Sequence, residues 1–376
     1  MHCAYFDTAR CRSCTWLPRP YAQQLAAKQQ AARHALGDDP GVHWSQPVAS
    51  AEAGFRNRAK MVVGGSIEAP VLGLLDAHGA GVDLEDCALY PQALRAAFAP
   101  LRRLISAARI APYDVPARRG ELKFVLVTLA EDSGALMIRF VLRSRESLRR
   151  LRGHLPQLQA ELPQAHVLSA NLQPVHQAVL EGDEEILLGA QDALPLRSNG
   201  LTLWVGPQAF AQTNTPVAAA LYRQARAWVQ ELDPPALLDL YCGAGGFALH
   251  CADGRRDVLG IESSAAAVAL ARRAAHDNAL PRIEFAALDA AQGAAALTAL
   301  PPLVIVNPPR RGLGAELCAT LQASAARWLI YSSCNAATLT RDLAALPGFR
   351  ARRAQVLDLF PHTAHYELLC LLERAA

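Results

Sequence analysis

Short hydrophobic runs alternate with alanine-rich stretches throughout the C-terminal half of the chain. Each run precedes a plausible helix, and this alternation is typical of a parallel sheet with right-handed crossovers. Two later runs have no long helix between them and predict an antiparallel pair at the sheet edge. We therefore predict a seven-stranded α/β sheet that ends in an antiparallel hairpin. Its expected strands are Ala236–Leu240, Val258–Glu262, Ile283–Ala287, Leu303–Val306, Trp328–Ser332, about Ala354–Phe360 and His365–Leu372.

A helix is predicted before the first of these strands. It begins at Thr215, whose hydroxyl can cap the backbone, with Pro216 at a favoured first-turn position, and it runs to about Leu232. Since the pattern changes at about residue 201, we place a domain boundary there. Residues 201–376 then form an α/β domain, and residues 1–200 form a separate domain.

The pattern in residues 1–200 predicts an α+β domain. Apolar runs at Leu122–Leu129 and Ala135–Leu142 flank a polar turn and predict a β-hairpin. An arginine-rich helix is expected from Glu146 to about Leu158. Further strands are expected between about Val167 and Leu188, interrupted by the acidic run Glu181–Glu185, which we interpret as a solvated turn. The first hundred residues show little sustained periodicity.

Composition agrees with two globular domains. The chain has 376 residues, 52% of them hydrophobic and 19% charged, which excludes disordered and collagen-like classes. No apolar run is long enough to span a membrane, and the start at Met1–Phe6 lacks the features of a signal peptide. We therefore expect a cytoplasmic protein. Nine cysteines in a reducing compartment are more often metal ligands, catalysts or core residues than disulfides.

The net charge of +3 does not by itself predict a nucleic-acid partner. Only three of the 37 lysine and arginine residues are lysines, and the rest are arginines, whose planar fork suits phosphates and base edges. A GC-rich genome explains the same bias. Arg56–Lys60 and Arg143–Arg152 are the candidate phosphate-binding stretches, and either can equally be a solvated face.

A glycine-rich loop, Asp239–Phe247, follows the first strand of the α/β domain. Such a loop lets the backbone approach a ligand at the carboxyl ends of the strands. Glu262 ends the second strand, where a carboxylate can accept hydrogen bonds from both ribose hydroxyls. The glycine spacing, Gly243-x-Gly245-Gly246, differs from the G-x-G-x-x-G of NAD-binding proteins. It is similar to the first motif of S-adenosylmethionine (SAM) methyltransferases, while a merely structural turn is the alternative.

Reactive side chains follow two other strands. Asn307–Gly312 ends the fourth strand and Ser332–Asn335 ends the fifth, so both open at the same sheet edge as the glycine loop. Cys334 is therefore a candidate nucleophile, although a cysteine here is more often a packing residue. Methylation of a pyrimidine at C5 requires a thiolate that adds to C6 and a base that removes the C5 proton. Pro361–Glu367 offers His362, His365 and Glu367 as bases, although Glu367 can also be an ordinary surface carboxylate.

Five motifs in order resemble those of the RNA uracil-C5 methyltransferases and cover essentially all of residues 201–376. This resemblance implies that Cys334 is the nucleophile and Glu367 the base. It implies that Gln212, Tyr241, Gly243, Glu262, Asp289 and Asn307 line the SAM site. Asn307 departs from the family, because many members have aspartate there, and an amide cannot accept a proton in that role. The motifs are Phe210–Asn214, Asp239–Phe247, Asn307–Gly312, Ser332–Asn335 and His362–Glu367.

Four cysteines in the first half form a candidate metal site. Cys3, Cys11 and Cys14 have the spacing C-x7-C-x2-C, and Cys87 supplies a fourth thiol. Spacing alone fits zinc and a [4Fe–4S] cluster equally well. The family resemblance implies a [4Fe–4S] cluster in an iron–sulfur domain that helps to hold RNA. The other cysteines have no partner at ligand spacing, and we interpret them as core or loop residues: Cys242, Cys251, Cys318 and Cys370.

The short segment before Cys3 and the sequence Asn307–Gly312 are similar to the branch of the family that lacks an N-terminal β-barrel. This branch acts on 23S ribosomal RNA, which is therefore the expected partner, with uracil 747 as the expected target. Because the cysteine lies deep in the fold, the uridine must flip out of its stack. Two alternatives stay open: another ribosomal or transfer RNA uridine, and a non-catalytic iron–sulfur RNA-binding protein.

Overall fold

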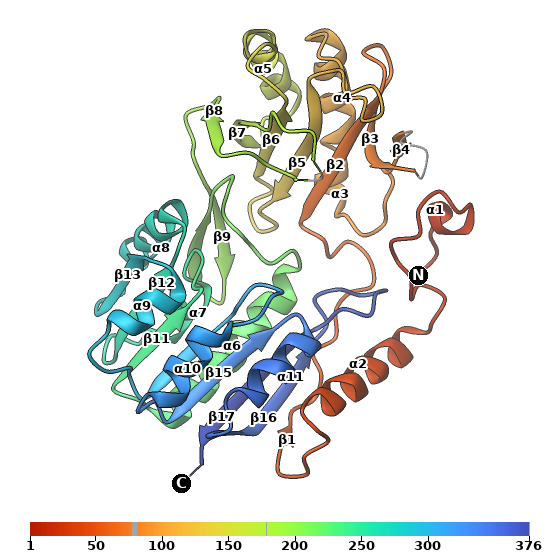
Figure 1. Ribbon diagram of the computed structural model, residues 1–376. Helices are drawn as coiled ribbons and strands as arrows, with labels where there is room; N and C mark the ends of the chain where they lie inside the picture. The colour runs from red at the N-terminus through yellow and green to blue at the C-terminus, as the bar shows by residue number, and fades with distance from the viewer. Residues whose placement is uncertain (77–80, 178, 376) are drawn as a thin grey trace. The chain divides into compact units, whose positions relative to one another are not determined.

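The computed structural model describes residues 1–76, 81–177 and 179–375, which form two compact units (Figure 1). The first unit contains residues 1–14, 52–196 and 206–208, and the second contains residues 15–51, 197–205 and 209–376. This division differs from the single boundary expected near residue 200. The reason is that helix α2 (Tyr21–Ala35) and strand β1 (His43–Trp44) pack against the C-terminal sheet.

The second unit is built on one sheet with the strand order β1-β16-β17-β15-β14-β11-β12-β13. Strands β11 to β15 are parallel, whereas β17 is antiparallel to both β15 and β16. The α/β prediction with a C-terminal hairpin is confirmed, but the described sheet has eight strands rather than seven, because β1 pairs with β16. The strands from β11 onward are β11 (Ala236–Leu240), β12 (Asp257–Glu262), β13 (Ile283–Ala287), β14 (Leu303–Val306), β15 (Trp328–Ser333), β16 (Phe349–Leu357) and β17 (Glu367–Arg374).

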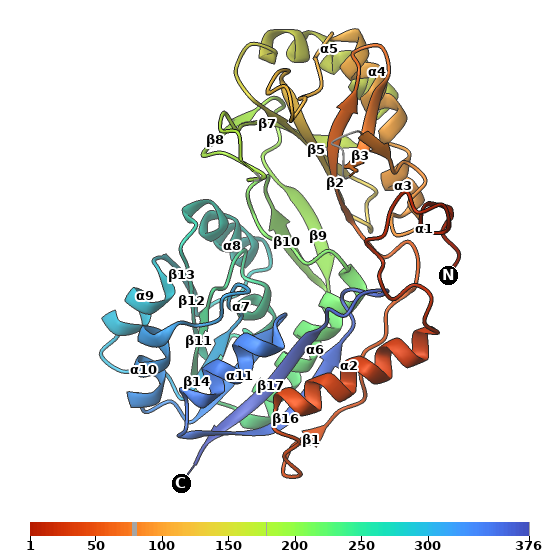
Figure 2. The same ribbon diagram turned by 45° about the vertical axis from the view of Figure 1, so that its right-hand side comes forward.

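Helices cover both faces of this sheet (Figure 2). Residues on β14 show why, since Leu303 and Ile305 belong to one apolar cluster and Val304 and Val306 to the other. A strand that is buried on both faces reads as a continuous apolar run. One face carries α6 (Thr215–Leu232), α7 (Gly246–Cys251) and α8 (Ala265–Asp277), and the other carries α2, α9 (Ala290–Ala296), α10 (Ala315–Ala323) and α11 (Ala336–Ala344).

Two element boundaries differ from the sequence prediction. Helix α6 is capped by Asn214, whose side chain accepts a hydrogen bond from the Val217 amide, and not by the hydroxyl of Thr215. Strand β16 begins at Phe349 rather than near Ala354, because its ladder with β17 extends to Arg374. Pairing with a partner strand, which the local pattern does not show, sets this boundary.

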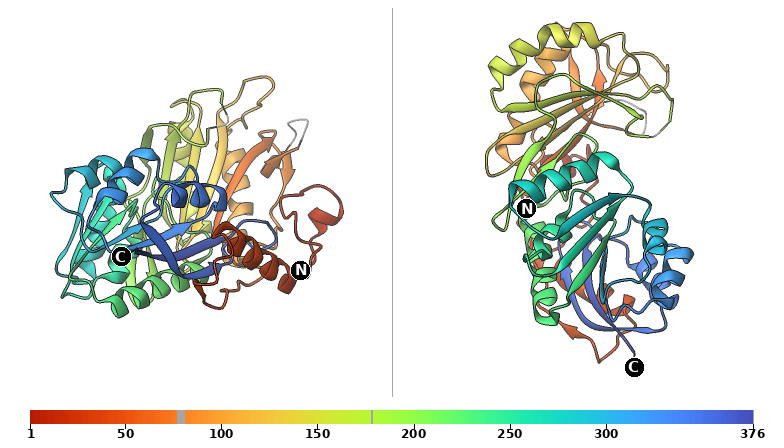
Figure 3. Two further views of the ribbon diagram at one scale, coloured as in Figure 1. Left: turned by 60° about the horizontal axis from the view of Figure 1, so that its bottom comes forward. Right: turned by 90° about the vertical axis from the view of Figure 1, so that its left-hand side faces the viewer.

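The first unit contains a sheet with the strand order β4-β3-β2-β5-β6-β7-β8. Helices α4 and α5 lie on one face of it, as the orange and yellow-green segments of Figure 3 (right) show. The predicted hairpin is confirmed, since β5 and β6 pair antiparallel. Its strands are β2 (Arg58–Gly65), β3 (Pro70–Leu75), β4 (Gly81–Asp83), β5 (Leu122–Leu129), β6 (Leu136–Leu142), β7 (Ala165–Leu172) and β8 (Glu184–Leu187), and its helices are α1 (Ala4–Asp7), α3 (Gln92–Arg95), α4 (Phe98–Ala107) and α5 (Leu148–Glu161).

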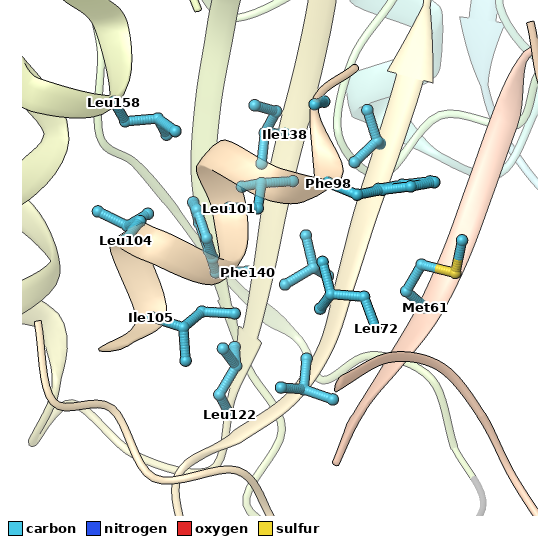
Figure 4. Close-up of a cluster of buried hydrophobic side chains, with 14 of the residues drawn as sticks. Met61, Leu72, Phe98, Leu101, Leu104, Ile105, Leu122, Ile138, Phe140 and Leu158 are labelled. Atoms are coloured by element: carbon cyan, nitrogen blue, oxygen red, sulfur yellow. The ribbon is translucent and has the colours of Figure 1, made fainter. Parts of the chain in front are cut away.

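The core of the first unit lies between this sheet and its helices. Leu101, Leu104 and Ile105 of α4 meet the buried side chains of β5 and β6 (Figure 4). The first hundred residues therefore contain more regular structure than their weak periodicity predicts, because β2, β3 and α4 are stabilised by this shared core. A two-stranded hairpin, β9 (Leu194–Ser198) and β10 (Leu201–Val205), follows the sheet.

The acidic run Glu181–Glu185 is largely exposed, as expected, but it is not only a turn. Glu184 and Glu185 begin β8, and Glu185 binds the guanidinium of Arg139, whose side chain is 2% exposed. Glu181 also pairs with Arg139, and Asn171 donates to Glu185 at 2.9 Å. A buried arginine needs carboxylate partners, and the run supplies them.

Among the described helices, none has the length and apolar character needed to cross a membrane.

Candidate active site

Four of the predicted site segments meet at one edge of the second unit's sheet. Strands β11, β12, β14 and β15 are parallel, so their carboxyl ends lie together. Tyr241, Asn307 and Cys334 directly follow β11, β14 and β15, and Glu262 is the last residue of β12. Strand β17 runs the opposite way and starts at this same edge, with Leu368 paired to Ser333. Glu367 therefore lies beside the segment that carries Cys334.

The glycine loop between β11 and α7 requires glycine for two reasons. Gly243 and Gly245 have positive φ angles of 54° and 88°, a conformation that glycine adopts readily. At Gly246 an added Cβ would lie 2.5 Å from the hydroxyl oxygen of Tyr222, so this glycine allows close packing. Tyr241 has a φ of 62° despite its side chain, which marks a sharp change of direction after β11.

Glu262 is fixed against the glycine loop. Its Oε2 accepts a hydrogen bond from the Gly243 amide at 3.2 Å, and its Oε1 accepts one from the Ser264 amide at 2.8 Å. The carboxylate is only partly buried, so lone pairs remain available for a ligand at the loop. The geometry thus brings together two of the predicted SAM-site residues and fits a ligand with two neighbouring hydroxyls.

Tyr241 and Asp289 approach each other closely enough for their charges to interact. Burial raises the pKa of Tyr241, and the negative charge of Asp289 raises it further. Asp289 is exposed and caps α9, accepting hydrogen bonds from the amides of Ala291 at 2.9 Å and Gln292 at 3.3 Å. Both residues therefore lie beyond the carboxyl ends of β11 and β13.

Asp239, inside β11, has a structural role at the start of the glycine loop. Its Oδ2 accepts a hydrogen bond from the Ala248 amide of α7 at 2.8 Å, and its side chain is fully buried. Burial raises the pKa of Asp239 to about 8, mainly because the charged form loses its water. Asp239 therefore holds the start of the glycine loop to α7.

Cys334 is partly buried and has charged neighbours of both signs. Burial raises the pKa of its thiol, and the nearby carboxyl group of Glu367 raises it further. Arg310 acts in the opposite direction, because its guanidinium carries a positive charge and hydrogen-bonds the thiol. The structure thus brings Cys334 and Glu367 together. It also adds Arg310, which the sequence shows only as part of the Asn307–Gly312 motif.

Glu367 is almost fully buried, with 2% of its surface exposed. The Ser332 hydroxyl donates a hydrogen bond to its Oε1. Burial raises the pKa of Glu367 to about 7, although the hydrogen bond from Ser332 lowers it in part. A carboxyl group with this pKa can accept a proton at neutral pH and release it again.

The loop that carries Arg310 is held by α11 and the residues before it. Asn335 donates a side-chain hydrogen bond to the Arg310 carbonyl at 3.0 Å. The buried Asp342 accepts hydrogen bonds from the Leu313 amide at 2.7 Å and the Tyr331 hydroxyl at 2.8 Å. No local pattern predicts the contribution of Asp342, because its partners are distant in the sequence.

The other two predicted site residues are placed by their elements. Asn307 directly follows β14, and its backbone N–H donates a hydrogen bond to the Leu240 carbonyl of β11 at 3.4 Å. Gln212 lies two residues before the capping residue Asn214 and is partly buried. The Asn214 side chain donates to the Ser50 hydroxyl at 2.8 Å, which fixes this segment to residues 15–51.

The four N-terminal cysteines gather in the first unit. All four are free thiols, and burial raises the pKa of Cys14 to about 12, with further increases from Cys87, Cys11 and Cys3. Thiol ligands are chemically suited to a metal or cluster. Among the described residues, however, no group of three or more His, Cys, Asp or Glu is placed so that it could hold a metal ion, so the structure does not show the predicted site.

The remaining cysteines are buried, as the interpretation of core residues predicts. They are Cys242, Cys251, Cys318 and Cys370.

Part of the basic stretch Arg143–Arg152 is paired within the first unit. Arg143 binds Glu121 at 3.0 Å, Arg145 binds Glu184, and Arg150 donates to the Arg109 carbonyl at 2.7 Å. Arg149 and Arg152 are exposed on α5.

Comparison with known proteins gives a consistent result. The family model described as tRNA (Uracil-5-)-methyltransferase matches residues 190–375. Proteins named 23S rRNA (uracil(747)-C(5))-methyltransferase RlmC are 51% identical in Yersinia enterocolitica and 50% identical in Escherichia coli O157:H7, each over 99% of both chains. The solved Pyrococcus abyssi tRNA (uracil-54, C5)-methyltransferase, in complex with S-adenosyl-L-homocysteine, is 25% identical and has a TM-score of 0.80 over 96% of this chain and 85% of that one.

Proposed function

Because the chain belongs to the RNA uracil-C5 methyltransferase family, we propose that it transfers a methyl group from SAM to C5 of a uridine in 23S ribosomal RNA. The RlmC proteins that are half identical to it over the full length support this substrate, and their name supports uracil 747 as the target. The chain is accordingly an RNA methyltransferase, and a ribosomal RNA substrate places it in the cytoplasm.

The observation that supports this proposal is that Glu367 lies beside the Cys334 segment at the glycine-loop edge, because Leu368 pairs with Ser333. The Cys334 thiolate adds to C6 of the flipped uracil and forms an S–C6 bond, which moves the C5–C6 electron pair into an enolate. C5 then attacks the methyl group of SAM, whose sulfur keeps the electron pair of the broken bond. Arg310 assists the first step, because its positive charge favours the thiolate.

Glu367 completes the reaction as the base. It accepts the C5 proton, the electrons of that C–H bond restore the C5–C6 double bond, and the S–C6 bond breaks to release Cys334. A pKa of about 7 suits this role, because a carboxylate with so high a pKa is a stronger base than an exposed one. The hydrogen bond from Ser332 fixes the direction of the carboxyl group.

We assign the SAM site to Gln212, Tyr241, Gly243, Glu262, Asp289 and Asn307. Replacing Glu262 by alanine is expected to weaken SAM binding about 10- to 100-fold, because a carboxylate hydrogen bond to a ribose hydroxyl is worth about 1.5–3 kcal/mol. Isothermal titration calorimetry with SAM measures this change. Glu284→Ala on β13 is the matched control, since Glu284 is an exposed carboxylate of the same sheet. Equal affinities in both variants would contradict the assignment.

We also propose that Cys3, Cys11, Cys14 and Cys87 hold a [4Fe–4S] cluster that stabilises the cysteine-bearing domain. Thiolates are the ligands that such clusters require, all four cysteines are free, and the charges of Cys3, Cys11 and Cys87 act on Cys14. Methyl transfer is redox-neutral, so the cluster takes no part in the reaction.

Anaerobically purified protein is expected to contain about four iron and four sulfide atoms per chain. Cys14→Ser should lose most of this iron, because a hydroxyl is a poor cluster ligand, whereas Cys318→Ala should keep it, because Cys318 is a core residue. Elemental analysis and the visible absorption spectrum measure both. A colourless protein with one zinc ion would show that the cluster assignment is wrong.

Mapping 5-methyluridine across the ribosomal and transfer RNAs, with and without the gene, tests the function as a whole. We expect the modification to disappear at one position of 23S ribosomal RNA, uracil 747. Loss of the modification at another uridine would change the assigned substrate but not the assigned reaction. An unchanged map, together with RNA binding but no SAM binding, would favour a non-catalytic RNA-binding protein.

For RNA contacts we propose the exposed arginines Arg149 and Arg152.

A further inference from the structure

A fully buried ion pair joins helix α2 to the loop between β16 and β17. The Lys28 Nζ donates to Asp358 Oδ1 at 2.7 Å, and both side chains are 0% exposed. Lys28 also donates to the Phe360 carbonyl at 3.0 Å, and the Tyr21 hydroxyl donates to Asp358 Oδ2 at 2.9 Å. A buried pair adds little net stability compared with apolar packing. The pair therefore calls for an explanation other than stability.

The position of Asp358 provides that explanation. Asp358 directly follows Leu357, and Leu357 is the strand partner of Glu367. The pair Leu357–Glu367 closes the β16–β17 hairpin at the edge where the site lies. Lys28 thus fixes the loop end of this hairpin, next to Glu367, which we assign as the base.

Gln24, one turn before Lys28 on α2, fixes the middle of the same loop. Its Oε1 accepts a hydrogen bond from the His362 amide at 2.8 Å, and its Nε2 donates to the Trp16 carbonyl at 3.1 Å. The His362 carbonyl accepts from the Trp16 amide at 2.8 Å. His362 has a φ of 64°, which residues other than glycine seldom adopt, so the loop needs such outside contacts to keep its shape.

The far side of the loop borders the nucleophile. The ring of Phe360 meets that of His365 edge-on, with centroids 6.3 Å apart. Burial lowers the pKa of His365, and the positive charges of Arg310 and Lys28 lower it further. Arg310 in turn hydrogen-bonds Cys334. The loop therefore runs from the α2 contacts at Asp358 and His362 to Glu367, whose neighbour Leu368 pairs with Ser333, the residue before Cys334.

We propose that Lys28 and Gln24 are positioning residues, which hold the loop 358–366 so that Glu367 meets the C5 proton. Helix α2 lies along β16 and can hold the loop from outside the site (Figure 2). This inference rests on the proposed function, because it assumes that Glu367 removes that proton. Residues 15–51 contribute only the short strand β1 to the sheet, but by this proposal they also help to position the base of the reaction.

The test compares Lys28→Met with Arg256→Met in the full-length protein. Arg256 is also buried in the second unit and binds Asp253 at 2.7 Å, but its partners lie outside the loop 358–366. We expect Lys28→Met to lower kcat for methylation about 10- to 100-fold, as a small misplacement of a reacting group does, and to change KM for SAM less than about threefold. Arg256→Met should lower thermal stability but leave kcat within about twofold below its melting temperature.

A covalent intermediate provides the second measurement. If proton removal is slowed, the S–C6 bond persists after methyl transfer, so Lys28→Met should accumulate an RNA–protein complex that survives denaturing electrophoresis. Arg256→Met should not accumulate it. A folded Lys28→Met protein with wild-type kcat, or one that loses activity without the complex, would overturn the inference.

Two further variants cover the case in which Lys28→Met does not fold. Lys28→Met with Asp358→Asn removes both charges, so it should fold but still show low kcat, because the hydrogen bond to the Phe360 carbonyl is lost. Gln24→Leu should give the same low kcat and covalent complex. Wild-type kcat in these variants would overturn the inference. If the wild-type protein itself does not methylate the RNA, the proposed function fails instead.

Discussion

Cys334→Ala is expected to abolish methylation of a 23S ribosomal RNA fragment, with a fall in rate of at least about 10³-fold. Without the thiolate, C5 of uracil is not nucleophilic enough to attack the methyl group. Cys242, the other cysteine that follows a strand at this edge, is buried, and burial raises the pKa of its thiol strongly. It therefore cannot replace Cys334. Transfer of radiolabelled methyl groups from SAM to RNA measures the effect.

The Cys334→Ala variant should still bind SAM, because the glycine loop and Glu262 are unchanged. RNA that contains 5-fluorouridine tests the thiol directly. A base cannot remove fluorine from C5 as it removes a proton, so the S–C6 bond is trapped after methyl transfer. Wild-type protein and Cys318→Ala should both form this trapped complex, and Cys334→Ala should not. Full methylation by Cys334→Ala would disprove the mechanism.

The pattern of apolar residues predicted the central sheet well because its strands are buried on both faces. Leu303–Val306 is apolar at every position and became β14 without change. The short strand β1 was not predicted, because His43 and Trp44 have no apolar run and pair only through the backbone of β16. The same holds for Arg139, whose burial depends on Glu181 and Glu185, which are far from it in the sequence.

The candidate site divides in the same way. Cys334 and Glu367 could be proposed as site residues because each lies in a short motif, and Glu262 because it ends a strand; the topology brings all three to one edge. The contribution of α2 could not, since Lys28 and Gln24 lie in a helix whose local sequence shows no motif. Their partners Asp358 and His362 follow more than 300 residues later. Tertiary contacts of this kind leave no periodic pattern in the chain.

The environment of Cys334 combines two opposing charges. Arg310 stabilises the thiolate, whereas Glu367 disfavours it when ionised. A protonated Glu367 removes that repulsion, and a pKa of about 7 keeps a large share of it protonated at neutral pH. After addition to C6 the sulfur is neutral, so Glu367 can release its proton to solvent and then accept the C5 proton. The two reacting groups are therefore charged at different stages of the proposed cycle.

Glu367→Gln is expected to slow turnover about 10²- to 10⁴-fold, because an amide cannot accept the C5 proton. Addition by Cys334 and methyl transfer should still occur, so the methylated RNA should remain bound to the protein through the S–C6 bond. Denaturing electrophoresis and tritium release from RNA labelled at C5 measure the two effects. In the wild type, proton release should rise with pH through about 7, since only the ionised carboxylate acts as base. A variant that turns over at the wild-type rate would contradict the role.

The same substitution has a predictable effect on stability, because the folded pKa of Glu367 is raised from its usual 4.5 to about 7. Between these values the folded protein binds more protons than the unfolded chain, so its stability falls as pH rises through this window. The loss reaches about 3 kcal/mol above pH 7. Glu367→Gln does not ionise, so it should be more stable than the wild type at pH 8 and similar at pH 4.5. Urea unfolding at both pH values measures the difference in the free energy of unfolding. A variant that gains stability while losing turnover would show that the buried carboxyl group serves the chemistry rather than the fold.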